Sequence, residues 1–364
     1  MPASRKLFVH VGLQKTGTSY LQAAMLRSSA ELAAQGLDLV PPTKRESYEL
    51  MVVVRDRYAS RRDDISDRET LRRFAAQLDR AKGSRAVFSQ ESLAAARPAQ
   101  IERFLAECGD REVHVVATVR DLARQLPSSW QQELKAGATV AYRPYLRRLR
   151  SLQEGGRGKH PWIHLDPPAV LGRWSAALAP DRIHVVTVPP AGSPTTALLE
   201  RFCRVLALDP SRLAPEQRPS NSSLGRVQAE VLRRVNAELP EELHRRYVYG
   251  EVGKRFFAAQ VLAAQEPRKI LVPTEFREWC EQTADRQIAD LAAAGYQLEG
   301  SLEDLRCAPD AFSDDERKPA EREVSAAAVS ALATMLTLRG KAENRRDRGR
   351  PDRLLSRLVG RGRP

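Results

Sequence analysis

Short segments of continuous apolar character recur along the first half of the chain and alternate with longer amphipathic segments. Apolar segments of roughly four to eight residues without polar alternation are typical of strands buried on both faces. Five of them are expected to be strands: residues 7–12, 37–40, 86–89, 113–119 and 183–188. Helical stretches, among them 68–82 and 101–108, lie between them. The pattern therefore predicts an α/β fold with a central parallel sheet flanked by helices.

Beyond residue 188 the apolar positions recur every 3 or 4 residues, a spacing typical of amphipathic helices. This spacing predicts helices at residues 195–206, 224–239, 247–264 and 274–294, and so a helical C-terminal portion. We expect one domain over residues 1–307, a polar linker over 308–320, an amphipathic helix over 321–340 and a basic, disordered tail over 341–364.

The composition narrows the classes of protein that fit. The chain has 364 residues, 42% hydrophobic and 29% charged, which is typical of a globular protein with a core and excludes a fibrous or wholly disordered one. The net charge of +13 favours an anionic substrate or partner. Nucleic acid is not the partner we expect, because much of this net charge is confined to residues 341–364, which contain nine Lys/Arg against three Asp/Glu. The rest of the chain is only mildly basic.

Cysteine and histidine spacing bears on metals and on the cellular compartment. The four cysteines lie far apart without a CxxC pair, and the six histidines form no HExxH pair. We therefore expect free thiols and no protein-bound metal. The chain shows neither a signal peptide nor an apolar run of the roughly 20 residues that span a membrane. A cytoplasmic location is the expectation.

The loop after the first expected strand has the features of an anion site. It reads Gly12-Leu-Gln-Lys-Thr-Gly-Thr-Ser19 and leads directly into a helix. Backbone N–H groups and the dipole at a helix N-terminus attract a phosphate, and a lysine adds a full charge. The ATP-binding signature GxxxxGK[ST] fits the glycine spacing, but Thr18 stands where its lysine is required, and the lysine is Lys15. This departure disfavours a nucleotide kinase or NTPase.

The stretch VHVGLQKTGTSYLQ resembles bacterial sulfotransferases that use 3′-phosphoadenosine-5′-phosphosulfate (PAPS). The resemblance continues through ATVRDLARQLPSSWQQELKAG, RIHVVTVPPAGSP and SNSSLGRVQAEVLRRVNAEL, and covers most of residues 5–306. It implies the P-loop-related sulfotransferase fold, with PAPS as co-substrate and no metal. It also implies a loop that binds the 5′-phosphosulfate, made of Lys15, Thr16, Gly17, Thr18 and Ser19.

The same resemblance implies a second anion site, for the 3′-phosphate. That site takes an arginine at a strand end and a serine eight residues later, which here are Arg120 and Ser128. The guanidinium offers a bidentate fork to the phosphate and the hydroxyl one further hydrogen bond. Two alternatives stay open: Ser129 is the donor if the register slips by one residue, or Arg120 pairs with Asp121 or with a surface carboxylate.

A general base is expected after the strand at 86–89, where related sulfotransferases have a Glu or His. Glu91 of AVFSQESL is the candidate, and capping of the next helix by Ser89 or Glu91 is the alternative. On the helix of Ser128, Trp130 and Gln132 are candidates for binding the acceptor. Residues 155–159, with Arg157 and Lys159, are a candidate lid over the cofactor.

The function predicted from the sequence is transfer of a sulfuryl group from PAPS to a hydroxyl, or an amine, of a glycan or small-molecule acceptor. Lys15 and Glu91 are the expected catalytic residues. Two alternatives stay open: a nucleotide kinase or NTPase, and a non-enzymatic protein whose basic tail binds nucleic acid or an acidic membrane surface.

Overall fold

The computed structural model describes residues 5–57, 65–155, 161–214, 223–315 and 318–348. Two compact units make up the chain. Unit 1 contains residues 1–130, 142–221 and 271–316, and unit 2 contains 131–141, 222–270 and 317–364. The division into domain, linker, helix and tail at residues 307, 320 and 340 stays a prediction.

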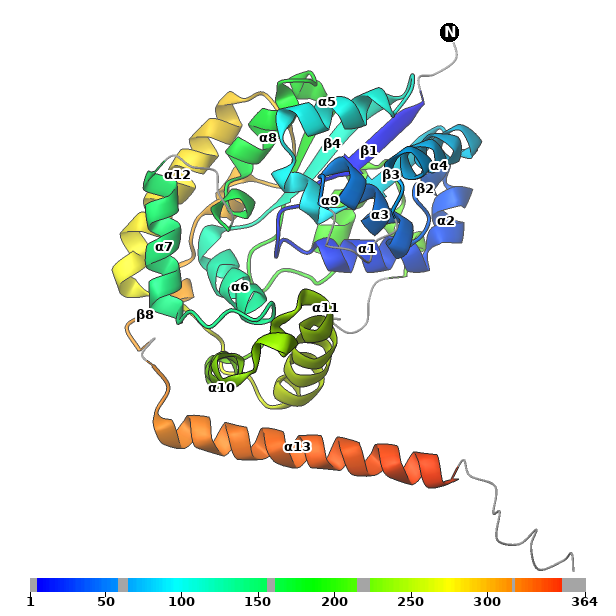
Figure 1. Ribbon diagram of the computed structural model, residues 1–364. Coiled ribbons are helices and arrows are strands. Elements are labelled where there is room, and N and C mark those ends of the chain that lie inside the picture. The colour runs from blue at the N-terminus through cyan, green and yellow to red at the C-terminus, as the bar shows by residue number, and fades with distance from the viewer. Residues whose placement is uncertain (1–4, 58–64, 156–160, 215–222, 316–317, 349–364) are drawn as a thin grey trace, which may run out of the picture. The chain divides into compact units, whose positions relative to one another are not determined.

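A six-stranded sheet forms the centre of unit 1, with the strand order β2-β3-β1-β4-β5-β7. Every neighbouring pair is parallel. Figure 1 shows β1 and β4 in the middle of the sheet. The strands are β1 (Lys6–His10), β2 (Leu37–Leu39), β3 (Arg85–Ser89), β4 (Glu112–Val119), β5 (Ile183–Thr187) and β7 (Gln297–Glu299). The predicted α/β class with a central parallel sheet flanked by helices is confirmed.

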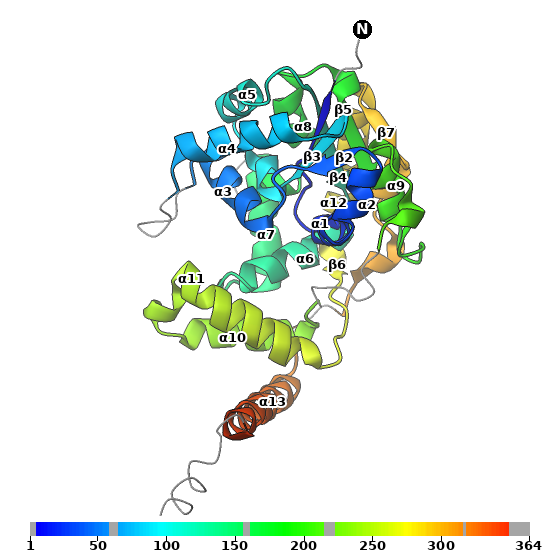
Figure 2. The same ribbon diagram turned by 90° about the vertical axis from the view of Figure 1, so that its right-hand side faces the viewer.

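Helices cover both faces of this sheet, because alternate residues of each buried strand point to opposite sides. Leu7 and Val9 of β1 belong to one apolar cluster with residues of α3, α4, α5, α8 and α12, whereas Phe8 belongs to another with residues of α1, α2 and α9. Figure 2 shows these two layers on either side of the strands. Continuous apolar sequence in β1 and β4 is thus a consequence of burial on two faces.

Three helices of these layers begin at capping residues that the sequence supplies. The side chains of Thr43, Ser66 and Asp166 accept hydrogen bonds from the first turns of α3, α4 and α8. The helices that cover the sheet are α1 (Thr18–Arg27), α2 (Ser29–Ala34), α3 (Lys44–Val54), α4 (Asp67–Arg80), α5 (Pro98–Ala106), α8 (Pro167–Ser175), α9 (Ala197–Val205) and α12 (Arg277–Ala293). Two more, α6 (Leu122–Leu134) and α7 (Tyr142–Glu154), follow β4 along the chain.

Three short strands were missed by the hydrophobic pattern. β7 has three residues and completes one edge of the main sheet, and β6 (Val272–Pro273) pairs with β8 (Phe312–Ser313) in a second, two-stranded sheet. Segments this short contain too few positions to show a period, so only their hydrogen bonds to distant strands define them. β8 lies inside the segment that was expected to be a linker.

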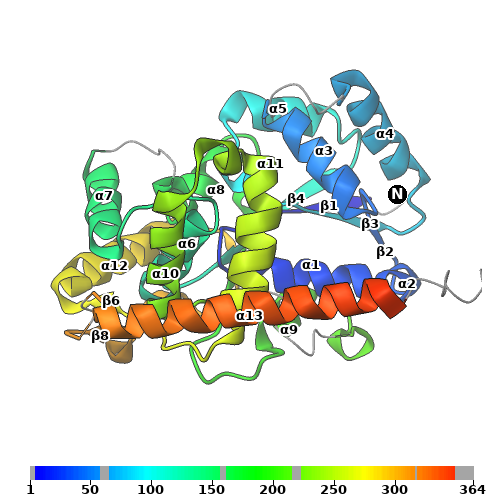
Figure 3. The ribbon, with the colours of Figure 1, turned by 60° about the horizontal axis from the view of Figure 1, so that its bottom comes forward.

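Unit 2 is helical. It contains α10 (Arg226–Glu238), α11 (Arg246–Tyr249), a π-helical segment (Gly250–Val261) and α13 (Glu321–Arg348). Figure 3 shows α13 running across α10 and the π-helical segment. Helix α13 begins where the sequence predicts and continues to Arg348, beyond residue 340, where the amphipathic helix was expected to end. Within the described residues, no helix combines the length and apolar character needed to cross a bilayer.

Candidate functional site

The loop between β1 and α1 lies at the carboxyl edge of the sheet, where ligands of open α/β folds bind. Its first residues continue the pairing with β4, since Val11 N donates to Val116 O (2.9 Å) and Leu13 N to Thr118 O (3.4 Å). Lys15 and Gly17 then adopt left-handed conformations, with φ of 67° and 91°. The left-handed backbone favours glycine at position 17, and a Cβ there would in addition require the end of the Leu198 side chain to shift. Turns that contain left-handed residues direct successive N–H groups into a concave anion site.

A chain of buried side-chain hydrogen bonds fixes this loop to the sheet. Thr16 Oγ1 bonds to Thr118 Oγ1 (2.7 Å) and donates to Leu13 O (2.6 Å). His10 Nε2 lies 3.3 Å from Thr118 Oγ1, and its Nδ1 lies 2.8 Å from Ser89 Oγ. Three adjacent strands, β3, β1 and β4, are thereby linked to the loop through one fully buried imidazole.

Beside this chain of bonds lies a polar atom with no partner. Thr18 Oγ1 is buried and has no hydrogen bond among the described residues. A Cβ on Gly12 would lie 2.5 Å from Thr18 Oγ1 and 2.7 Å from His10 Nε2, so no other residue fits at position 12. An unsatisfied buried hydroxyl costs free energy, which a ligand that accepts its hydrogen bond would recover.

Arg120 follows β4 and lies against the same loop. Its Nη1 donates to Lys15 O (3.2 Å), and its Nε is buried without a partner in the described part of the chain. The alternative pairing with Asp121 is not observed, because the Asp121 carboxylate accepts from both the backbone and the side chain of Arg124. Burial lowers the pKa of Arg120 to about 10, so the guanidinium is still charged at neutral pH.

The two candidate serines on α6 differ in their partners. Ser129 is buried, and its Oγ lies 2.7 Å from the hydroxyl of Tyr145 in a buried hydrogen bond. Ser128 is partly exposed, and its Oγ makes only a long hydrogen bond (3.4 Å) to Arg124 O within its own helix. The packing thus favours Ser128 as the ligand donor, as the spacing predicts; its role stays a prediction.

Glu91 is the first residue of a short 3-10 helix, Glu91–Ala95, directly after β3. The cap of that helix is Gln90, whose side chain accepts from Ser92 N (3.4 Å), so neither Ser89 nor Glu91 has the capping role. Arginines hold the segment in place: Arg55 donates to Ser92 O, and Arg173 donates to Ala94 O (2.7 Å) and Ala96 O (3.0 Å). The candidate base therefore lies on a fixed segment at the same sheet edge as the loop.

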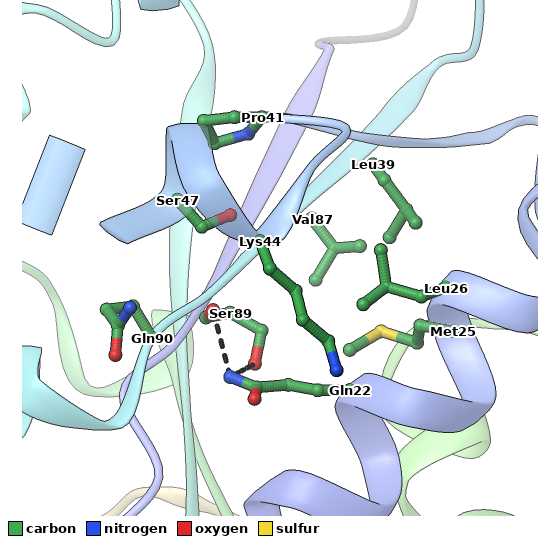
Figure 4. Close-up of a pocket in the computed structure, with 10 residues that line it drawn as sticks. All are labelled: Gln22, Met25, Leu26, Leu39, Pro41, Lys44, Ser47, Val87, Ser89 and Gln90. Carbon is green, nitrogen blue, oxygen red and sulfur yellow. Dashed lines mark hydrogen bonds between the residues drawn. The ribbon is translucent and has the colours of Figure 1, made fainter. Parts of the chain in front are cut away.

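A small pocket opens at the carboxyl ends of β2 and β3, with a volume of about 170 Å³. Figure 4 shows Lys44 pointing toward Gln22, whose amide donates to both the carbonyl (3.1 Å) and the hydroxyl (3.2 Å) of Ser89. The pocket is lined by Gln22, Met25, Leu26, Leu39, Pro41, Lys44, Ser47, Val87, Ser89 and Gln90. Ser89 and Gln90 connect this pocket to the segment that begins with Glu91.

The remaining candidates lie in different environments. Trp130 is 4% exposed and packs on Tyr142, with the ring centroids 4.9 Å apart, in the manner of a core side chain. Gln132 is half-buried and belongs to unit 2. The candidate lid falls largely on residues 156–160, outside the described residues. Acceptor binding by Trp130 and Gln132 stays a prediction.

Sequence reasoning missed three residues that build the site. His10 and Thr118 join the loop to the sheet, and Gln125 donates from α6 to Gln14 O (2.7 Å) and His164 O (3.1 Å). A signal was present for the first two, since each is a polar residue near the carboxyl end of an otherwise apolar strand. Gln125 carries no such signal, because a glutamine on a helix is ordinarily solvated.

Comparisons with known proteins add little to this geometry. No protein-family model and no curated protein matches the chain. Among solved structures, a sulfotransferase from Alicyclobacillus acidocaldarius aligns over 81% of this chain and 97% of its own, with 13% identity and a TM-score of 0.45. A similarity this low assigns no activity to this chain. Among the described residues, no group of three or more His, Cys, Asp and Glu is placed to hold a metal ion.

The buried imidazole makes the site sensitive to acid. Burial lowers the pKa of His10 from 6.5 to about 3, so the unfolded chain binds a proton between these values that the folded chain does not. The neutral imidazole therefore lowers the free energy of unfolding as the pH falls from 6.5 toward 3, by about 1.4 kcal/mol per pH unit, and has no such effect above pH 6.5.

We expect His10→Asn to flatten the pH dependence of the free energy of unfolding, measured in urea between pH 6 and 4. Substituting the exposed His244 by Asn should leave the slope unchanged, and an equal change in both variants would contradict the assignment.

Proposed function

We propose that the protein is a sulfotransferase that binds PAPS at the carboxyl edge of its sheet. The observation that carries the proposal is the half-buried side chain of Arg120, which donates to a carbonyl, has a buried Nε without a partner and forms no ion pair within the described residues. Desolvation of a charge that is not ion-paired is costly, and an anionic ligand would supply the ion-pair partner. The orphaned hydroxyl of Thr18 and the left-handed turn at Lys15 and Gly17 favour the same class of ligand.

The residues present fit the two anionic groups of PAPS. The backbone of residues 15–19, with the hydroxyls of Thr18 and Ser19 and the ammonium of Lys15, would hold the 5′-phosphosulfate. Arg120 and Ser128 would hold the 3′-phosphate, the arginine through a bidentate fork. Thr16 would contribute its N–H, because its hydroxyl is already bonded to Thr118 and to Leu13 O.

The proposed reaction transfers the sulfuryl group in line from the phosphate to an acceptor hydroxyl or amine. The bond between sulfur and the bridging oxygen breaks as a bond from sulfur to the acceptor forms, and 3′,5′-adenosine diphosphate leaves. Glu91 takes the acceptor proton, and Lys15 stabilises the negative charge that develops on the bridging oxygen. Preorganised donors at the loop supply stabilisation without rearrangement during the reaction.

The acceptor side of the site is inferred from the pocket beside β3. This pocket lies next to the segment that begins with Glu91. An acceptor that places one part in the pocket would therefore bring its reacting hydroxyl toward the proposed base. The volume of the pocket is below the roughly 300–1,000 Å³ of pockets that enclose a drug-sized ligand, which favours partial burial of a larger acceptor. A glycan or small molecule fits this description.

A nucleotide kinase or NTPase is disfavoured by two features. The lysine precedes the second glycine of the loop, and the acidic residue that follows β4, Asp121, is ion-paired with Arg124. The Asp121 carboxylate thus already has a cationic partner and caps α6 through Arg124 N, whereas an NTPase needs a carboxylate here to bind Mg²⁺.

Nucleotide binding is the first test. Calorimetric titration with 3′,5′-adenosine diphosphate should show binding that Arg120→Ala weakens roughly tenfold to a hundredfold, the value of one or two charged hydrogen bonds. Arg80→Ala, at an exposed arginine on α4, is the matched control, and Arg120→Lys separates loss of the fork from loss of charge. Binding of ATP with Mg²⁺ alone would instead support the NTPase.

Lys15 is tested by turnover. We expect Lys15→Ala to lower kcat by roughly 10²-fold or more, comparable to the loss of one oxyanion donor, measured as sulfate transfer from ³⁵S-labelled PAPS to a panel of glycans and phenols. The exposed Lys82→Ala serves as control. Turnover near that of the unchanged protein would remove Lys15 from the mechanism.

Glu91 is tested by separating binding from chemistry. The isosteric Glu91→Gln should bind 3′,5′-adenosine diphosphate as the unchanged protein does while transfer falls by roughly 10²-fold or more, the contribution of a general base. Glu102→Gln, at an exposed position on α5, should affect neither. Full transfer by the Glu91→Gln variant would mean that another group takes the proton.

A further inference from the structure

Helix α13 carries more apolar surface than its contacts in unit 2 cover. Ala328, Ala331 and Met335 face a cavity against α10 and the π-helical segment. Val329, Leu332 and Leu336 are 63%, 60% and 74% exposed, although all three are large apolar side chains. Their spacing of three and four residues places them along one stripe of the helix. These three residues are called the apolar strip below.

The strip borders an apolar pocket of about 400 Å³ between α10, the π-helical segment and α13, called the cavity here. Leu332 belongs to both the strip and the cavity lining, and Val252, which also lines the cavity, is 46% exposed. The polar lining side chains are already engaged: Tyr249 donates to Leu134 O (3.0 Å), and Asn236 donates to Leu134 O and Ala138 O (2.9 Å each). The apolar surface therefore continues from the cavity to the outside.

A cationic segment follows the strip directly. Residues 339–364 contain ten Lys/Arg and three Asp/Glu, a net charge of +7. Arg339 and Lys341 are exposed on the same helix. The first turn of α13 is acidic instead, and its Glu321 is ion-paired with Arg234 of α10. Charge is thus distributed unevenly along the helix, with the cations beyond the exposed apolar residues.

We propose that unit 2 docks on the surface of an anionic lipid bilayer through α13, with the apolar strip in the boundary between headgroups and acyl chains. Helices that combine an exposed apolar stripe with Lys/Arg bind in this way, and each cation near an anionic membrane adds to the attraction. The proposal does not depend on the PAPS site, since none of its residues belongs to the loop or to the sheet of unit 1.

Two other occupants fit the observations less well. Nucleic acid would attract the cations through its phosphates, but it would gain nothing from exposed Leu and Val side chains next to them. A second copy of the chain would cover the strip, but it would also bring two segments of +7 into one assembly, where they repel. The bilayer alone uses both the apolar and the cationic features.

The test is flotation of the purified full chain with phosphatidylcholine vesicles, with and without phosphatidylglycerol. We expect binding only to the anionic vesicles, decreasing as salt is raised. The double variant Leu332→Glu/Leu336→Glu should partition at least roughly tenfold more weakly than the control Ser330→Glu/Thr337→Glu, because burial of a leucine contributes about 1.5 kcal/mol or more. The control adds the same charge at exposed positions on a different stripe of α13.

The same variants provide the fold control and the results that would contradict the proposal. Circular dichroism and thermal melting establish that both double variants are folded. Absence of binding to anionic vesicles, equal binding to neutral ones, or equal partitioning of the two double variants would each overturn the proposal. So would a dimer in light scattering that the Leu variant alone dissociates, or binding to a single-stranded oligonucleotide in place of vesicles.

Discussion

The site depends on how the loop between β1 and α1 is held. A loop that presents its backbone N–H groups to a ligand cannot use those groups to fix its own conformation. Here the strands of the sheet fix the conformation of the loop, through the hydrogen bonds Thr16–Thr118–His10–Ser89 and through the pairing of Val11 and Leu13 with β4. The imidazole has to be neutral to donate at one nitrogen and accept at the other, and its burial ensures this. Catalysis by preorganised donors requires such a rigid support.

A second constraint is electrostatic. Arg120 is half-buried beside the loop with its Nε out of contact with solvent, and the nearest carboxylate along the chain, that of Asp121, is bound to Arg124. Stability alone would favour a carboxylate partner or an apolar residue at this place. Violations of this kind are expected at functional sites, where the ligand supplies the missing partner. The proposed function rests on this argument and not on overall similarity to another protein.

The two units differ in the kind of group that is left without a partner. At the loop of unit 1 the unsatisfied groups are the buried Thr18 Oγ1 and Arg120 Nε, two donors that favour a small anionic ligand. In unit 2 the polar groups of the cavity are satisfied among themselves, and the unsatisfied surface is the apolar strip of α13 beside a cationic segment. An extended surface of that kind is typical of a larger partner such as a bilayer.

The sequence by itself determined the class of fold and the place of the site. Continuous apolar strands require helices on both faces of a parallel sheet, and the residues after the strands at 7–12, 86–89 and 113–119 had to meet at one edge, because parallel strands end on the same side. Only the tertiary structure decided the partners: that Asp121 is hydrogen-bonded to Arg124 and not to Arg120, that Gln90 caps the helix of Glu91, and that Ser129 bonds to Tyr145 while Ser128 does not. Periodicity reports which face of an element is buried, whereas a hydrogen bond between residues far apart in sequence depends on the packing of whole elements. The role of His10 and the short strand β7 belong to this second kind of information.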